Sequence, residues 1–273
     1  GIGNFCDPDL NNDGIVGSAD RNILNSSFFQ STVDGGFNAD ADLNGDGNIN
    51  FLDLAILQSR IGDTPGPPGT IVWVATTGGS WFDADNWLPA VVPTEGVRAI
   101  VDVAPALTVE LSGGSVKVRR LILDETLRID SATLEATQGV DVDFAGTVIL
   151  STATINNTVF VPSQSGGGSV TVTSAGLTRL NNVSLDVETV MQNGAIADVT
   201  GGLTVRDTLT IDAPTAPTGL HFSESQTLSG NGSIVFSAPG NTVVTEPRLR
   251  PSSGTTLTVG NDLSIRGDVG TIG

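Results

Sequence analysis

The chain is poor in the residues that form disulfides, act as catalytic bases or bind soft metals. It has one cysteine (Cys6), one histidine (His221), one lysine (Lys117) and no tyrosine. A single cysteine excludes an internal disulfide framework, so Cys6 is either a free thiol or pairs outside this sequence. Any Ser-His-Asp arrangement would depend on His221 alone, and no nucleophile-elbow motif frames a serine. We therefore expect His221 to be a neutral or surface side chain.

Long apolar runs are also missing, and none approaches the roughly 20 residues that span a bilayer. The formal net charge of −18 disfavours nucleic acid and anionic membrane surfaces as partners. The chain begins Gly-Ile-Gly, without an initiator Met or a signal peptide, which indicates a mature, processed or trimmed form. A composition rich in Thr, Val, Ser, Gly and Asn is typical of a β-rich secreted protein. We predict an extracellular, surface-associated protein without membrane insertion.

Two acidic stretches, one beginning at Asp9 and the other at Asp42, fit the twelve-residue calcium loop. In each, Asp, Asn and Asp at positions 1, 3 and 5 bring alternate side-chain oxygens to one point. Glycine at position 6 permits the sharp turn, a main-chain carbonyl serves as the seventh-position ligand, and an aspartate closes the loop. Hard oxygen donors favour calcium or magnesium over zinc or copper. The predicted ligands of two Ca²⁺ ions are Asp9, Asn11, Asp13, Ile15 and Asp20 in the first loop, and Asp42, Asn44, Asp46, Asn48 and Asp53 in the second.

Each loop leads into a short helix-like stretch, and this loop–helix duplication resembles the type I dockerin module over residues 7–62. The resemblance implies a small calcium-folded module, which in cellulosomal members docks onto a cohesin domain of a scaffold protein. The partner-contacting positions of the family read Ser18-Ala19 in the first repeat and Phe51-Leu52 in the second. Because the two pairs differ, both cohesin docking and a role as a calcium-rigidified joint or cap remain open.

The charge of the segment 1–63 predicts that metal is needed for folding. This segment contains ten aspartates and only two basic residues, Arg21 and Arg60. Closely spaced carboxylates repel one another without a cation, and so short a segment can bury little apolar surface. Val16 and Ile49, both at position 8, are expected to meet as an apolar bridge between the loops. Calcium should therefore contribute much of the folding free energy.

The sequence changes character after a Pro/Gly segment, residues 64–70, which is predicted to be a semi-stiff linker. We expect a calcium-binding domain at 1–63 and a β domain at 71–273. In the β domain, short alternating runs such as 127–129, 148–150 and 170–172 are separated by turn residues. Their loose spacing of about 20 residues favours a parallel β-solenoid, with a β-sandwich as the alternative. The predicted fold class is thus mainly β, with a small α module that precedes the β domain in the chain.

The repeat style of the β domain resembles right-handed β-helices of large bacterial surface proteins, which implies that more coils could follow Gly273. All three tryptophans, Trp73, Trp81 and Trp87, lie at its start. They are expected to plug the open first coil, which would otherwise expose the core and an unpaired edge. An exposed platform for sugar rings is the alternative interpretation.

No acidic pair or basic cluster predicts a catalytic site, because the acids of the β domain are scattered along the chain. We therefore expect a calcium-stabilised structural protein, such as a surface shaft, adhesin or filament subunit, and not an enzyme. Its partner would be a protein, either a second copy or a cohesin-like scaffold. A dockerin-borne component and a polysaccharide-binding or polysaccharide-degrading β-helix are the alternative functions.

Overall fold

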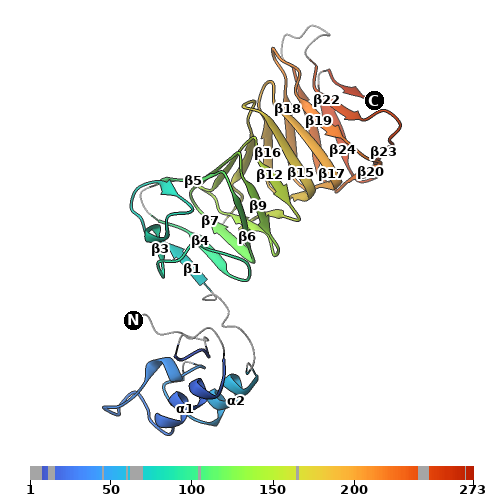
Figure 1. The fold of residues 1–273 in the computed structure, drawn as a ribbon. Coiled ribbons are helices and arrows are strands. Elements are labelled where there is room, and N and C mark those ends of the chain that lie inside the picture. Colours follow the sequence, from blue (N-terminus) through green and yellow to red (C-terminus); the bar gives the residue numbers. More distant parts are fainter. Residues whose placement is uncertain are drawn as a thin grey trace. The chain divides into compact units, whose positions relative to one another are not determined.

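The computed structural model (Figure 1) divides into two compact units, Gly1–Thr70 and Ile71–Gly273. The structure describes residues 8–11, 16–44, 46–59, 61, 70–103, 106–163, 166–238, 246–267 and 269–273. Cys6 and most of the predicted linker lie outside the described residues. No described helix is long and apolar enough to span a bilayer.

The first unit is built from two short helices, α1 (Ser18–Ser26) and α2 (Phe51–Ser59), with a 3₁₀ turn, η1 (Ala39–Ala41), between them. Nine-residue helices are marginal alone in water, so packing must hold them. Their shared core repeats with the sequence, because Val16 and Leu24 are buried beside their counterparts Ile49 and Leu57. The buried cluster comprises Val16, Leu24, Ala41, Leu43, Ile49 and Leu57.

The second unit is a parallel β-solenoid of about seven turns over residues 98–272, as the fold-class prediction expected. Parallel pairing between successive coils excludes the β-sandwich alternative. Two sheets, of 16 and nine strands, wrap the coils. The larger sheet turns a corner within the two long strands at 177–185 and 196–205, whose first and second parts pair with different strands. We therefore distinguish three faces of the solenoid.

Face 1 contains β6 (Ser115–Val118), β9 (Thr133–Ala136), β12 (Thr154–Asn156), the first parts of β15 (Leu177–Leu185) and β17 (Ile196–Val205), β19 (Gly219–Phe222), β22 (Arg248–Pro251) and β25 (Thr271–Ile272). Face 2 contains β1 (Thr70–Trp73), β4 (Arg98–Val101), β7 (Arg120–Leu123), β10 (Val140–Val142), β13 (Val159–Pro162), the second parts of β15 and β17, β20 (Gln226–Ser229) and β23 (Leu257–Val259). Face 3 is the nine-stranded sheet of β2 (Gly79–Ser80), β5 (Thr108–Ser112), β8 (Thr126–Asp130), β11 (Thr147–Ser151), β14 (Ser169–Val172), β16 (Glu188–Met191), β18 (Thr208–Asp212), β21 (Ser233–Ser237) and β24 (Ser264–Gly267).

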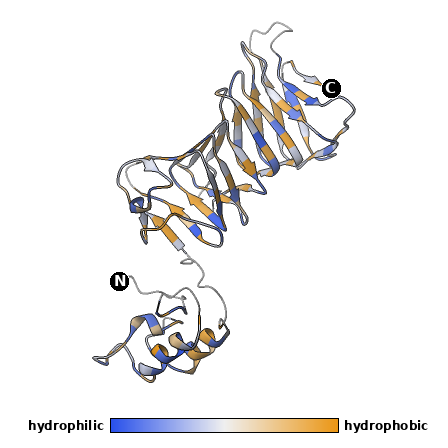
Figure 2. Ribbon diagram, in the orientation of Figure 1, coloured by the Kyte–Doolittle hydropathy of each residue, from blue (hydrophilic) through white to orange (hydrophobic). Residues whose placement is uncertain are grey.

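Coil length varies more than the loose repeat of the sequence predicts. On face 3, Thr108 pairs with Thr126 of the next coil, whereas Ser233 pairs with the much more distant Ser264. The extra residues lie in the connections, while the strands stay in register. Alternate strand residues therefore point inward at every turn, and Figure 2 shows the resulting alternation of hydrophobic and hydrophilic positions.

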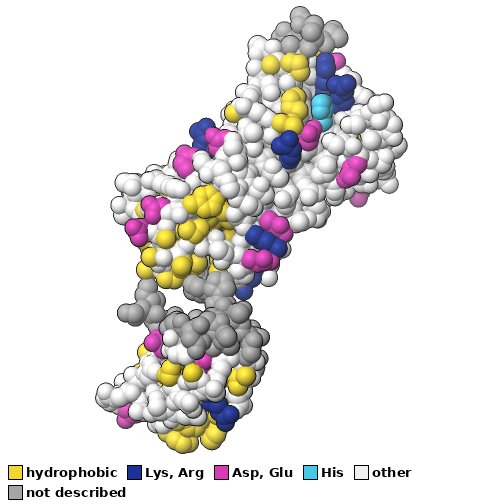
Figure 3. Space-filling model, viewed as in Figure 1, with side chains coloured by type: hydrophobic (Ala, Val, Ile, Leu, Met, Phe, Trp, Pro, Cys, Tyr) yellow, Lys and Arg dark blue, Asp and Glu magenta, His cyan; other side chains and the backbone are white. Residues whose placement is uncertain are grey.

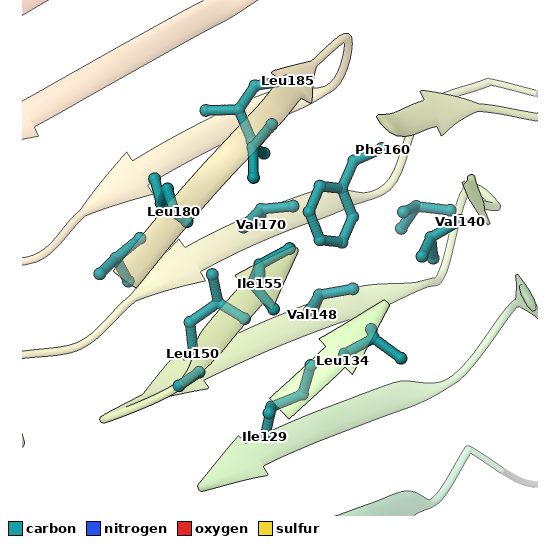
Figure 4. Close-up of a cluster of buried hydrophobic side chains, with 14 of the residues drawn as sticks. Ile129, Leu134, Val140, Val148, Leu150, Ile155, Phe160, Val170, Leu180 and Leu185 are labelled. Carbon is teal, nitrogen blue, oxygen red and sulfur yellow. The ribbon is translucent and has the colours of Figure 1, made fainter. Parts of the chain in front are cut away.

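The interior is a set of apolar ladders. Figure 4 shows side chains of consecutive coils packed in layers, with Val148 and Val170 from face 3 near Phe160 from face 2. These partners are set by the register, since Val148 pairs with Val170 and Phe160 pairs with Val140. A long continuous core of this kind is the main source of stability of a solenoid.

Corners of the solenoid use left-handed backbone positions. Gly113, Ser131 and Thr152, with φ of 67°, 53° and 56°, follow β5, β8 and β11 at the corner between face 3 and face 1. At the next corner Asn157 and Asn182 have φ of 46° and 52°. Asparagine tolerates this conformation better than most residues. The Asn182 side chain also donates to the Asn157 side-chain oxygen at 3.0 Å, so the corners stack as a ladder.

Tryptophans close the first coil. β3 (Trp87–Leu88) pairs antiparallel with β1, setting Trp73 opposite Trp87, after the short 3₁₀ turn η2 (Ala84–Asn86). The Trp87 ring makes edge-to-face contacts with Trp73 at 5.0 Å and Trp81 at 4.8 Å. Its indole N–H donates to the Trp81 carbonyl at 2.8 Å. All three rings are buried in the solenoid core, so they cap the coil and cannot form an exposed platform for sugars.

Truncating a buried ring should destabilise the solenoid far more than truncating an exposed one. Phe160 is 0% exposed, whereas Phe144 is 77% exposed. We expect Phe160→Ala to lower the free energy of unfolding by about 3–5 kcal/mol and Phe144→Ala to change it by less than about 0.5 kcal/mol. Tryptophan fluorescence during urea unfolding measures this directly, because every tryptophan lies in the second unit. Equal losses in the two variants would contradict the stacked core.

Candidate functional site

The closing aspartates of the two loops hold their loops in the same way. Asp20 accepts the backbone N–H of Asn11 at 3.1 Å and that of Gly17 at 2.7 Å. In the second repeat, Asp53 accepts the N–H of Asn44 at 3.1 Å and that of Asn50 at 2.8 Å. Each carboxylate thus ties the beginning of its loop to the end.

Both closing carboxylates are fully buried. A buried carboxylate is costly unless hydrogen bonds and a counter-charge compensate its lost hydration. At each closing carboxylate, two backbone N–H groups supply the hydrogen bonds, but they supply no counter-charge. A divalent cation between the loop oxygens would supply the remainder.

The second loop presents only oxygen donors. Asp42 accepts the N–H groups of Asp46 and Gly47, at 3.2 and 2.8 Å, and wraps the loop about its own carboxylate. Gly47 has a φ of 81°, which only glycine adopts easily. Asn44 and Asp46 remain exposed beside this turn. Hydrogen bonds from the Asn44 side chain and the Asn48 backbone lower the pKa of Asp46, which keeps it ionised.

This donor set fits calcium. Asp42, Asn44, Asp46 and Asp53 would bind through side chains, and Asn48 through its main-chain carbonyl. Within the described ranges no three His, Cys, Asp or Glu side chains form a metal cluster by themselves. The loop instead combines carboxylates with amide and carbonyl oxygens, which soft or borderline metals disfavour.

The first loop is described in part. Asp9 and Asp20 are buried and Asn11 is exposed, which matches their counterparts Asp42, Asp53 and Asn44. The other predicted ligands, Asp13 and Ile15, lie outside the described residues.

An exposed aromatic face lies next to the second loop. We define it by Phe28, Phe29, Phe51 and Leu52. The ring of Phe28 lies 4.7 Å from that of Phe29 and 5.1 Å from that of Phe51, both edge to face. Phe29, Phe51 and Leu52 are 75%, 67% and 60% exposed. Large apolar side chains gathered on a surface are characteristic of protein interaction sites.

The two repeats contribute to this face unequally, since Phe28 and Phe29 follow α1 of the first repeat, whereas Phe51 and Leu52 precede the closing aspartate of the second. Ser18 and Ala19 occupy the positions of Phe51 and Leu52 in the first repeat, and both are exposed. Neither offers comparable apolar area. Sequence reasoning identified the unequal pairs but missed Phe29, whose φ of 67° no local pattern predicts. A phenylalanine held in this conformation costs about 1–2 kcal/mol, which surrounding contacts must offset.

Backbone hydrogen bonds connect the aromatic face to the second loop. The N–H of Phe29 donates to the Ile49 carbonyl at 2.8 Å, and the N–H of Ile49 donates to the Gln30 carbonyl at 2.8 Å. Phe51 and Leu52 immediately precede Asp53. Calcium in the second loop would therefore also fix both segments of the aromatic face.

In the solenoid, the sequence predicted no catalytic residues. His221 lies on face 1 with its Nδ1 3.7 Å from the Asp198 carboxylate, and its side chain is partly exposed. Glu125 is buried and accepts the backbone N–H of Leu107 at 2.8 Å, which anchors a connection between coils. The sequence predicted a neutral or surface position for His221, but not its contact with Asp198 or the burial of Glu125, because both depend on the register of the coils.

Comparison with protein families gives one result. Residues 7–62 match the model of the dockerin type I domain, which confirms the resemblance inferred from the two loops. Domains of this family bind calcium and occur in extracellular proteins. Neither the curated proteins nor the solved structures include a match to the chain.

Replacing one closing aspartate should weaken metal binding. Asp53→Ala removes a carboxylate that can bind calcium with both oxygens, so we expect at least about a tenfold loss of affinity at the second loop. Isothermal titration calorimetry with Ca²⁺ measures it. Asp34→Ala is the matched control, since Asp34 is exposed and lies outside both loops. An unchanged titration for Asp53→Ala would reject the ligand assignment.

Chelation should unfold the first unit alone. With EDTA the buried aspartates lose their counter-charge, so the helical signal of α1 and α2 should fall. The solenoid core consists of apolar ladders, and its tryptophan fluorescence should stay constant. Circular dichroism and fluorescence recorded on one sample separate the two units. A helical signal indifferent to EDTA would show that metal does not order the first unit.

Proposed function

We propose, from the dockerin type I domain at residues 7–62, that this protein is an extracellular docking component. Its first unit binds a cohesin-type domain in the presence of two calcium ions. The solenoid that follows is a structural spacer rather than an enzyme.

The aromatic face is the observation that carries this proposal. Partly exposed rings of Phe28, Phe29 and Phe51 touch one another and lie beside exposed Leu52. Exposure of such apolar side chains to water is unfavourable, and a partner that buries them removes this unfavourable free energy. Central aromatic anchors are typical of residues that dominate binding energy.

Only the second repeat has this apolar pair, so the partner should dock in one orientation. Docking by the first repeat would place Ser18 and Ala19 at the centre of the interface. Their small side chains bury too little apolar area to replace Phe51 and Leu52.

Calcium dependence of docking follows from the backbone connections. Phe29 is held by Ile49 of the second loop, and Phe51 and Leu52 precede its closing aspartate. Without the ion, the loop and both segments of the aromatic face lose their common support. Calcium and the partner should therefore bind cooperatively.

A spacer role for the solenoid rests on its uniform construction. Apolar ladders continue through its coils, and tryptophans close the first one. Acidic side chains on its surface take part in ion pairs, as in Arg120 with Asp141 and Arg206 with Asp186. We propose no catalytic role for them.

Removing the two apolar side chains of the second repeat should strongly weaken docking. We expect Phe51→Ala with Leu52→Ala to weaken binding by about 100-fold or more, since each anchor contributes on the order of 2 kcal/mol. Surface plasmon resonance against a panel of purified type I cohesin domains, with calcium and then with EDTA, provides the measurement.

The first repeat supplies the matched control. Ser18→Ala with Ala19→Ser exchanges small exposed side chains at the equivalent positions and should leave binding unchanged. Calcium titration of both double variants verifies that their loops still bind metal. Binding that survives loss of Phe51 and Leu52, or that fails in the first-repeat variant, would refute docking by the second repeat.

A further inference from the structure

Face 1 carries a row of charged side chains that the register brings together. Arg179 pairs with Asp198, Asp198 with His221, and His221 with Arg250 across β15, β17, β19 and β22. These four residues come from four successive coils and are well separated in the chain. Adjacent strands are about 4.8 Å apart, so the two arginines are separated by about 14 Å. We call this row the arginine–histidine ladder.

All four side chains of the ladder face solvent. Their neighbours along each strand, including Leu180, Val199, Phe222 and Leu249, are buried in the core. Arg248 lies on the outer side of the same strand as Arg250, opposite Gly219, which has no side chain to cover it. Figure 3 shows the single histidine beside an acidic side chain, with basic side chains towards both ends and apolar ones along one flank.

Several cations of the solenoid lie in ion pairs. Lys117 lies 2.7 Å from Glu95, Arg120 is 2.8 Å from Asp141, and Arg206 is 2.9 Å from Asp186. Among the described residues, no carboxylate forms an ion pair with Arg179, Arg248 or Arg250. In a chain with 30 acidic and 12 basic residues, guanidinium groups left without partners on one face are available to an external anion.

We propose that the arginine–histidine ladder binds an acidic polysaccharide, a linear glycan with carboxylate groups on its sugars. Guanidinium groups form paired hydrogen bonds with carboxylates, which suits Arg179 and Arg250 at the two ends. Between them, Asp198 accepts hydrogen bonds from sugar hydroxyls. His221 can donate one or accept one. Two cationic groups with hydroxyl-binding groups between them match a chain that carries carboxylates at intervals and hydroxyls between them.

Other polyanions fit less well. Single-stranded nucleic acids bind through aromatic stacking platforms as well as cations, and the outer side of the ladder carries no Phe, Tyr or Trp, only the ring of His221. A continuous phosphate backbone would also lie against Asp198. The net charge of −18 does not oppose a local contact, because charges beyond about 10 Å are largely screened at 0.1 M salt.

Affinity measurements on the full chain with calcium test the ladder. Polygalacturonate is the probe, a neutral galactan is the uncharged control and poly-glutamate is the anionic control without hydroxyls. We expect Arg179→Gln with Arg250→Gln to weaken polygalacturonate binding about tenfold, as two exposed charge-assisted contacts are lost. The single variant Arg250→Gln should give a smaller loss in the same direction.

Arg98→Gln is the matched control, because Arg98 is also exposed and lies on face 2. It should bind polygalacturonate like the unaltered chain, and tryptophan fluorescence should be alike in all variants. Equal losses from Arg98→Gln, no binding of polygalacturonate, or equal binding of poly-glutamate would each overturn the proposal. Cohesin binding, measured in parallel, depends on the first unit and is independent of these outcomes.

Discussion

In-register stacking of successive coils is the constraint on which the solenoid depends. Once Val148 pairs with Val170, each inward position meets another inward position, and every outward position meets another outward one. Apolar ladders, the stacked asparagines at 157 and 182, and the arginine–histidine ladder are three consequences of this one rule. Paired strands of successive coils lie about 4.8 Å apart along the stack, whereas the connections between strands can vary in length.

The first unit obeys a different repeat. Its duplication places equivalent groups around a common small core, and the closing aspartates Asp20 and Asp53 make matching backbone contacts. So small a core cannot by itself offset the burial of carboxylates. With calcium bound, metal binding, helix ordering and presentation of the aromatic face would be parts of one equilibrium, and each would strengthen the others.

Much of this organisation can be read from the sequence. Alternation identifies strands at 127–129, 148–150 and 170–172, and the loop template gives Asp42, Asn44, Asp46 and Asp53 as neighbours. Strands β15 and β17 are not predicted as continuous elements, because Asn182 and Gly201-Gly202 resemble turns although the sheet bends through them. The arginine–histidine ladder could not be predicted, since its register depends on three unequal coil lengths. Phe29 joins the aromatic face only through a left-handed backbone.

The two repeats of the first unit are alike where they would touch metal and different where they touch solvent. Backbone distances to Asp20 and Asp53 agree closely, at 3.1 and 2.7 Å against 3.1 and 2.8 Å. At the adjacent outward positions, Ser18 and Ala19 are replaced by Phe51 and Leu52. If the duplication served folding alone, neither repeat would need exposed aromatics, which favour unwanted association. Phe51 and Leu52 extend the face that Phe28 and Phe29 of the first repeat begin. Exposing them has a physical reason only if a partner covers them, and the loop geometry would then let calcium keep the face in place.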